Sequence, residues 1–207
     1  MRLIDISPPI SPALAVWPGD TPSSREILAD MATGDNLTLS THRATVHLGS
    51  HADAPSHYVV DGDSIDRADL RRYIGPCQVV SVDVDRGARA DPDHLAAVVT
   101  EPRVLVRTGS FPNPRSFNED FSALSPKLVS HLAAGGVKLL GIDTPSVDLF
   151  DSKELPSHLA CAKHDVRILE GLVLHDVADG IYELIALPLA LVGFDASPVR
   201  AVLCELD

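Results

Sequence analysis

Residues 47–57 read His47-Leu48-Gly49-Ser50-His51-Ala52-Asp53-Ala54-Pro55-Ser56-His57, and they constrain the fold more than any other stretch of the chain. Alternate positions carry three histidines, one aspartate, one glycine and one proline, whereas Leu, Ser and Ala fill the positions between. Alternate side chains of an extended chain lie on one face. The side chains with metal or proton chemistry are therefore expected to start on the same side.

This stretch is not expected to stay straight. Ten residue steps of extended chain reach roughly 33 Å, whereas metal ligands converge within about 2.0–2.2 Å of one ion. Gly49 and Pro55 are the residues that permit or impose the required bends.

Imidazole and carboxylate ligands suit zinc and similar divalent metals. We therefore hypothesise that His47, His51 and Asp53 bind metal and that His57 is left for acid–base chemistry. Two alternatives stay open, namely a purely structural cluster and a metal site that binds no substrate.

The composition indicates an ordinary globular protein that forms one domain over residues 1–207. The chain has 207 residues, of which 45% are hydrophobic and 22% charged, and no repeat or linker interrupts it. Its net charge of −12 argues against nucleic acid or an anionic membrane as a partner, because both need clustered Lys and Arg.

The cysteines indicate a reducing compartment. Cys77, Cys161 and Cys204 are far apart, odd in number and without a CxxC pair, so reduced thiols in a cytoplasmic protein are expected. We expect no signal peptide and no membrane span, because no apolar run has the length that either requires.

Strand patterns alternate with helix starts along the chain, which predicts a strand-rich α/β domain with a few short helices. A proline at the first helical position marks three expected helix starts, at Pro92, Pro126 and Pro156, and the second helix should end at Gly135-Gly136. The expected strands include residues 2–7, 37–48, 78–84, 103–107, 137–142 and 168–175.

Glu170 lies in an apolar run, Ile168-Leu169-Glu170-Gly171-Leu172-Val173-Leu174. An ionised carboxylate there is costly unless it is paired, hydrogen-bonded or bound to metal. It lies either on an exposed strand edge or at the metal site, where it could bridge two ions from the side opposite Asp53.

Two further candidates, His158 and Trp17, remain ambiguous from composition. His158, in the helix that Pro156 starts, is either a surface residue or a ligand, with His164 and His175 as competitors. Trp17 lies in a proline-rich loop, where it either plugs the core or forms a pocket wall.

Several common catalytic motifs are missing from the sequence. There is no HExxH, no GxSxG and no glycine-rich phosphate loop, which excludes a zincin-type peptidase, a serine-hydrolase elbow and the common nucleotide-binding loops.

The pattern HxGxHxDxPxH at positions 47–57 resembles the signature of the cyclase-like metal-dependent hydrolases. Ser50 stands where that family usually has Thr, and it keeps the hydroxyl group. The similarity runs through almost the whole chain and includes residues 5–9, 16–22, 137–146, 168–171 and 182–189.

The resemblance implies a compact domain with a barrel-like mixed sheet flanked by a few short helices, of the swivelling β/β/α type, and a homodimer. It also implies two zinc ions per subunit, with manganese as an alternative. His47 and His51 would bind the first ion, His158 the second, and Asp53 and Glu170 both. His57 would be the general acid/base, and Trp17 would line the substrate pocket.

The implied reaction is hydrolysis of N-formyl-L-kynurenine to L-kynurenine and formate, a step of tryptophan degradation. The nearest rival is hydrolysis of a cyclic amide such as isatin by a related enzyme of the same family. A rival of another class is a metal-binding protein without catalytic activity.

Overall fold

A nine-stranded mixed sheet organises the chain, whose computed structural model describes residues 2–205. Residues 1, 206 and 207 of the expected domain lie outside the described residues. The strands, in their order across the sheet, are β1 (Leu3–Asp5), β13 (Val202–Glu205), β11 (Gly180–Ile185), β5 (Ile74–Ser81), β7 (Arg103–Arg107), β9 (Leu139–Ile142), β10 (Arg167–Glu170), β4 (His51–Asp53) and β12 (Ala196–Pro198).

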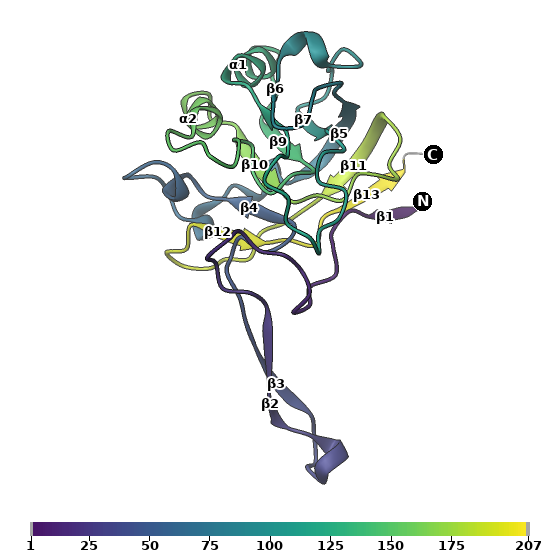
Figure 1. Cartoon of the computed structure of the whole chain (residues 1–207), viewed down its shortest axis with the longest axis vertical. Coiled ribbons are helices and arrows are strands. Elements are labelled where there is room, and N and C mark those ends of the chain that lie inside the picture. Colours follow the sequence, from purple (N-terminus) through teal and green to yellow (C-terminus); the bar gives the residue numbers. More distant parts are fainter. Residues whose placement is uncertain (1, 206–207) are drawn as a thin grey trace.

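The centre of the sheet is parallel, and two helices serve its crossover connections. Strands β5, β7, β9 and β10 run parallel, and helices α1 (Pro126–Ala134) and α2 (Pro156–Lys163) lie side by side against the sheet (Figure 1). Both helices begin at the proline that predicted them. Ser125 caps α1 by accepting a hydrogen bond from the Leu128 amide at 3.0 Å.

The central strands are buried on both faces, which explains why they read as near-continuous apolar runs. Leu105, Leu139 and Leu169 join one hydrophobic core. Their neighbours Leu140 and Ile168 join a second core, which includes residues of α1 and α2.

Antiparallel pairing at one end of the sheet brings distant segments together. Strand β4 lies between β10 and β12, so that His51 pairs with Glu170 and Asp53 pairs with Ala196. Part of the histidine stretch thus contacts chain that follows more than 100 residues later.

A β-hairpin projects from the body of the molecule (Figure 1). It consists of β2 (Ser24–Ala29) and β3 (Leu39–Arg43), with a 3-10 helix at Met31–Thr33. The sequence predicted strand within residues 37–48 but missed the partner strand. A separate two-stranded parallel sheet is formed by β6 (Arg89–Ala90) and β8 (Ala123–Leu124).

Several predicted elements are shorter than expected, including the strand expected over 37–48, of which only Leu39–Arg43 is strand. The strand expected over 168–175 ends at Glu170, because Gly171 turns the chain with a φ of +65°. The helix expected at Pro92 is one 3-10 turn, Pro92–His94. The other 3-10 helices are Pro55–His57, Ile65–Arg67 and Leu70–Arg72.

The expected α/β class, a curled mixed sheet with few short helices, is confirmed. Within residues 2–205, none of the helices has both the length and the apolar character needed to cross a membrane.

Candidate metal centre

Two glycines allow the histidine stretch to fold onto the end of β10. Gly49, between His47 and His51, has a φ of +57°, in the left-handed region that glycine tolerates. A Cβ atom on Gly171 would lie 2.2 Å from the Gly49 carbonyl oxygen. Ser50 Oγ also donates a hydrogen bond to the Gly171 carbonyl at 2.8 Å, which holds the two segments together.

Asp53 is fully buried and lies among three histidines. Its Oδ1 atom lies 3.2 Å from His47 Nδ1 and 3.5 Å from His51 Nε2. Its Oδ2 atom lies 3.5 Å from His158 Nε2. The two oxygens of one carboxylate therefore face opposite sides of the cluster.

Glu170 has the same arrangement. Its Oε2 atom lies 3.3 Å from His51 Nε2, and its Oε1 atom lies 3.4 Å from His158 Nε2. Oε1 also accepts a hydrogen bond from the Val147 amide at 2.7 Å. The structure thus places Glu170 inside the cluster and not at an exposed strand edge.

The polar atoms of this cluster fit a bound divalent cation. Among residues 2–205, six buried side-chain polar atoms have no hydrogen-bond partner, and four of them belong to His51, Asp53 and His158. Such atoms each cost about 1–3 kcal/mol when unsatisfied. Ligands placed tetrahedrally around one ion at 2.0–2.2 Å are about 3.3–3.6 Å apart, which is close to the separations observed here.

Second hydrogen bonds fix the imidazole rings of the buried histidines. The Nδ1–H group of His51 faces the Gly49 carbonyl at 2.9 Å, and that of His158 faces Asp148 Oδ2 at 2.8 Å. In both rings this assignment leaves the Nε2 lone pair directed at the carboxylates. Metal-binding histidines are typically held in this way.

Asp148 is a fully buried part of this cluster that was not predicted from the sequence. Arg89 Nη1 donates a hydrogen bond to its carboxylate at 2.6 Å. The backbone amides of Ser157 and His158, at the start of α2, donate to the same carboxylate at 3.1 Å. Burial raises the pKa of Asp148, but the contacts with His158 and Arg89 outweigh burial and hold the pKa at about 2. The only sequence signal is its position eight residues before the proline that starts α2.

The charges of the cluster shift its pKa values. Burial lowers the pKa of His47, but the carboxylates of Asp53 and Asp195 outweigh burial and raise it to about 9. The pKa of His158 is also raised, because Asp148, Asp53 and Glu170 outweigh its burial. Burial opposes ionisation of Asp53, yet the histidines hold its pKa well below the usual range.

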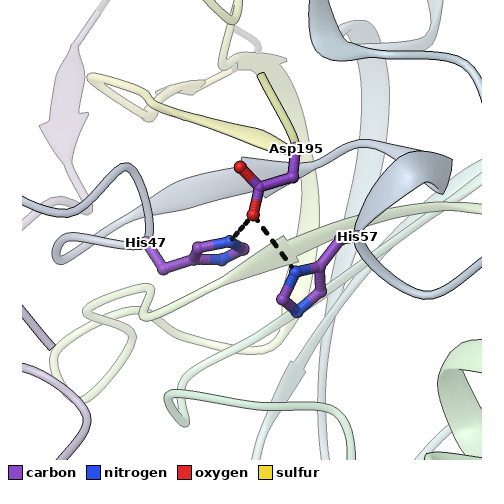
Figure 2. A group of neighbouring side chains, drawn as sticks. All are labelled: His47, His57 and Asp195. Carbon is purple, nitrogen blue, oxygen red and sulfur yellow. Dashed lines mark hydrogen bonds and ion pairs between the residues drawn. The ribbon is translucent and has the colours of Figure 1, made fainter. Parts of the chain in front are cut away.

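His57 lies at the more exposed edge of the cluster, on the turn Pro55–His57. Figure 2 shows its ring beside that of His47, with one carboxylate oxygen of Asp195 contacting both rings. His57 also offers a nitrogen that lies within 4.8 Å of ligand atoms of Asp53 and His158. The geometry therefore allows either proton transfer or metal ligation by His57.

Six of the seven predicted site residues line one cavity of about 520 Å³, and Asp53 is buried beside it. Trp17 lines this cavity, is half-buried outside both hydrophobic cores, and packs on other aromatic rings. Its ring centroid lies 5.0 Å from that of Phe150 and 5.5 Å from that of Phe117.

The competing histidines lie outside the ligand cluster. His164 Nε2 pairs with Ser130 Oγ at 3.1 Å and does not line the cavity. His175 lines the cavity but is largely exposed and pairs with Asp176.

Fold and site together define a class of protein, in which a curled α/β sheet carries a buried histidine–carboxylate centre beside an aromatic-lined cavity. The family model for cyclases, described as "Putative cyclase", matches residues 4–149. The kynurenine formamidase of Bordetella petrii is 47% identical to this chain over 99% of both sequences. The chain therefore belongs to the cyclase family, in the group that contains the bacterial kynurenine formamidases.

Solved structures agree with this assignment. A structure described as a "Potential Metal-Dependent Hydrolase With Cyclase Activity" superposes with a TM-score of 0.85, at 27% identity, over 98% of this chain and 96% of that one. Isatin hydrolase A from Labrenzia aggregata superposes with a TM-score of 0.83 over 98% of this chain and 93% of its own. At 21% identity, the second comparison shows a shared fold alone.

Proposed function

We propose that this protein is a metal-dependent amidase that hydrolyses N-formyl-L-kynurenine to L-kynurenine and formate. One observation carries the proposal: buried, unpartnered ligand atoms of His51, Asp53 and His158 lie beside a cavity with an aromatic wall. The formamidase relatives, at 47% identity over 99% of both chains, support the choice of substrate.

The proposed metal ligands follow the geometry of the two carboxylates. His47 and His51 would hold one ion, His158 a second, and Asp53 and Glu170 would bridge both. Each carboxylate presents one oxygen to the His51 side and the other to the His158 side, which supports this assignment. The ligand chemistry favours zinc, with manganese as the alternative.

Bound divalent ions supply Lewis-acid chemistry, which polarises an amide carbonyl and makes water more nucleophilic near neutral pH. The chain itself supplies proton transfer. His57 directs Nδ1 towards Asp195, which leaves Nε2 as the nitrogen that donates a proton to the departing anilide nitrogen. Without this proton, the nitrogen would have to leave as an anilide anion, which is a poor leaving group.

The cavity wall supplies substrate binding. Trp17, Phe111 and Phe117 line the cavity, and the rings of Trp17 and Phe117 meet edge to face. Aromatic rings favour such offset or edge contacts with another ring. We propose that the aryl ring of the substrate packs against Trp17, which places its formamide group near the histidines.

The test combines metal analysis with a formate assay. Purified protein is assayed with N-formyl-L-kynurenine as isolated, after treatment with a chelator, and after addition of Zn²⁺ or Mn²⁺. Formate release should be abolished by the chelator and restored by the metal. Turnover by metal-free protein would contradict the proposal.

The same assay separates the rival functions. A higher kcat/KM for isatin than for N-formyl-L-kynurenine would identify a cyclic-amide hydrolase. Bound zinc without formate release, even at high protein concentration, would identify a non-catalytic metal-binding protein.

We also propose that the protein acts in the cytoplasm as a homodimer. All three cysteines are buried and unpaired, which is compatible with a reducing compartment. Exposed apolar side chains of the β2–β3 hairpin, including Ile27, Leu28 and Leu39, offer surface for association. Sedimentation equilibrium tests the homodimer directly, and a single species of 22.1 kDa would contradict it.

A further inference from the structure

Asp195 occupies a fixed position beside the histidine stretch although it follows it by about 140 residues. It directly precedes β12, which pairs with β4, and its carbonyl accepts a hydrogen bond from the Ala54 amide at 2.9 Å. The carbonyl of the preceding residue, Phe194, accepts from the Ile65 amide at 2.9 Å. These backbone contacts hold Asp195 in the wall of the cavity, which it lines.

One oxygen of Asp195 contacts two histidines (Figure 2). Oδ2 lies 2.9 Å from His47 Nε2 and 3.4 Å from His57 Nδ1. The rings of His47 and His57 are themselves close, with centroids 4.2 Å apart. Among residues 2–205, Asp195 is the only acidic residue that forms an ion pair with His57.

We propose that Asp195 is a positioning residue that holds His47 and His57 in a fixed relation to each other. The hydrogen bond to His47 Nε2 orients the ring so that Nδ1 faces Asp53 at 3.2 Å. The contact with His57 Nδ1 restricts that ring so that Nε2 remains free. The His57 part of this inference rests on the proposed function.

The exposure of Asp195 argues against a role in core stability. Its side chain is 46% exposed, so truncation removes little packing and leaves no buried cavity. The fold is therefore expected to survive substitution. A carboxylate that orients a metal-binding histidine typically contributes 10- to 100-fold to metal affinity.

The test uses Asp195→Ala and Asp195→Asn, with Asp63→Asn as the matched control. The Asp63→Asn substitution also removes one negative charge. The Asp63 side chain, however, is 68% exposed and does not line the cavity. Zinc affinity is measured by competition with a chromophoric chelator, and kcat and KM are measured at saturating zinc.

Asp195→Ala should bind zinc about 10- to 100-fold more weakly and, at saturating zinc, lose kcat with little change in KM. Asp195→Asn should retain more of both properties, because its amide oxygen can still accept the hydrogen bond from His47 Nε2 and can still lie against His57 Nδ1. The Asp63→Asn control should match the wild type in both measurements.

Wild-type affinity and wild-type kcat in both Asp195 variants would overturn the inference. Weaker zinc binding with an unchanged kcat would overturn the part that concerns His57. If the wild type itself releases no formate, the proposed function fails, and the zinc affinities alone then decide whether Asp195 positions His47.

Discussion

At the scale of single residues, the centre depends on carboxylates that each serve two sides of one cluster. Asp53 directs Oδ1 towards His47 and His51 and Oδ2 towards His158. Because the side chain is fully buried, it has no access to bulk water that could replace these contacts. Its charge is therefore balanced by the neighbouring histidines or by a cation.

Asp53→Ala should lose metal from both proposed positions, because it removes an oxygen from each. Elemental analysis of the purified variant checks this, with Asp63→Asn as the control for loss of one exposed charge. A full metal complement in Asp53→Ala would show that Asp53 does not bridge.

His57→Ala separates proton transfer from metal ligation, the two roles that its position allows. If His57 transfers a proton, the variant keeps its metal, and kcat falls by about 10²–10⁴-fold. The measurements are metal content and formate release at saturating substrate. Loss of one metal equivalent would instead identify His57 as a ligand.

At the scale of elements, short strands and tight turns bring the ligands together. His51 and Asp53 alternate along β4 and share a face, and Glu170 pairs with His51 from β10. Residues opposite each other in neighbouring strands lie on the same face of the sheet. Strand pairing thereby places Glu170 beside the histidines without any proximity in sequence.

Gly171→Ala should disturb this pairing. The new Cβ would lie 2.2 Å from the Gly49 carbonyl oxygen, in a residue with a φ of +65°, so both strain and overlap should destabilise the fold and weaken metal binding. Gly136→Ala is the matched control, because Gly136 has a φ of +96° and open space around it.

Chemical denaturation and zinc titration of the two variants check the effect. The control should lose about 1–2 kcal/mol of unfolding free energy from backbone strain alone. Gly171→Ala should lose more than the control, and it alone should bind zinc weakly. Equal losses would mean that the close approach to Gly49 is unimportant.

Local patterns predicted much of the secondary structure. Apolar runs predicted β5, β7 and β9, and the Ser-Pro and Pro signals predicted α1 and α2, because both depend on neighbouring residues alone. The partner of β3 was missed, since the hairpin strands are exposed along most of their length and carry no clear alternation. The end of β10 was misplaced, because the turn at Gly171 depends on contact with Gly49.

The candidate site was only partly predictable for the same reason. The alternation of residues 47–57 indicated His47, His51, Asp53 and His57 as a group. Composition left Glu170 and His158 ambiguous, and only the family resemblance indicated them as site residues. Asp148 and Asp195 carry no local pattern, because their importance arises from tertiary contacts with histidines.

At the scale of the whole molecule, the buried histidine–carboxylate cluster couples folding to pH. In metal-free protein the pKa of His47 is raised from 6.5 to about 9. Its protonation therefore contributes stability that is fully present below pH 6.5 and is lost as the pH rises through about 9. His158 shifts in the same direction.

Metal-free protein should accordingly unfold at lower temperature as the pH rises from about 6.5 to 9. Zinc-loaded protein should not follow this trend, because metal binding requires neutral histidines and strengthens as they lose protons. Thermal melts with chelator and with zinc across this pH range check the difference, and His47→Gln should flatten the metal-free profile. Parallel profiles with and without zinc would contradict the coupling.

The pairing of β4 between β10 and β12 has a consequence for biosynthesis. The ribosome delivers the histidine stretch early, but the second helix and the glutamate that complete the cluster emerge about 100 residues or more afterwards. A nascent chain that has been synthesised only as far as His57 contains His47, His51 and Asp53 but lacks His158 and Glu170. If the centre binds metal as proposed, capture of the ion would therefore come late in folding, and the cell would have to supply the metal to a nearly complete polypeptide.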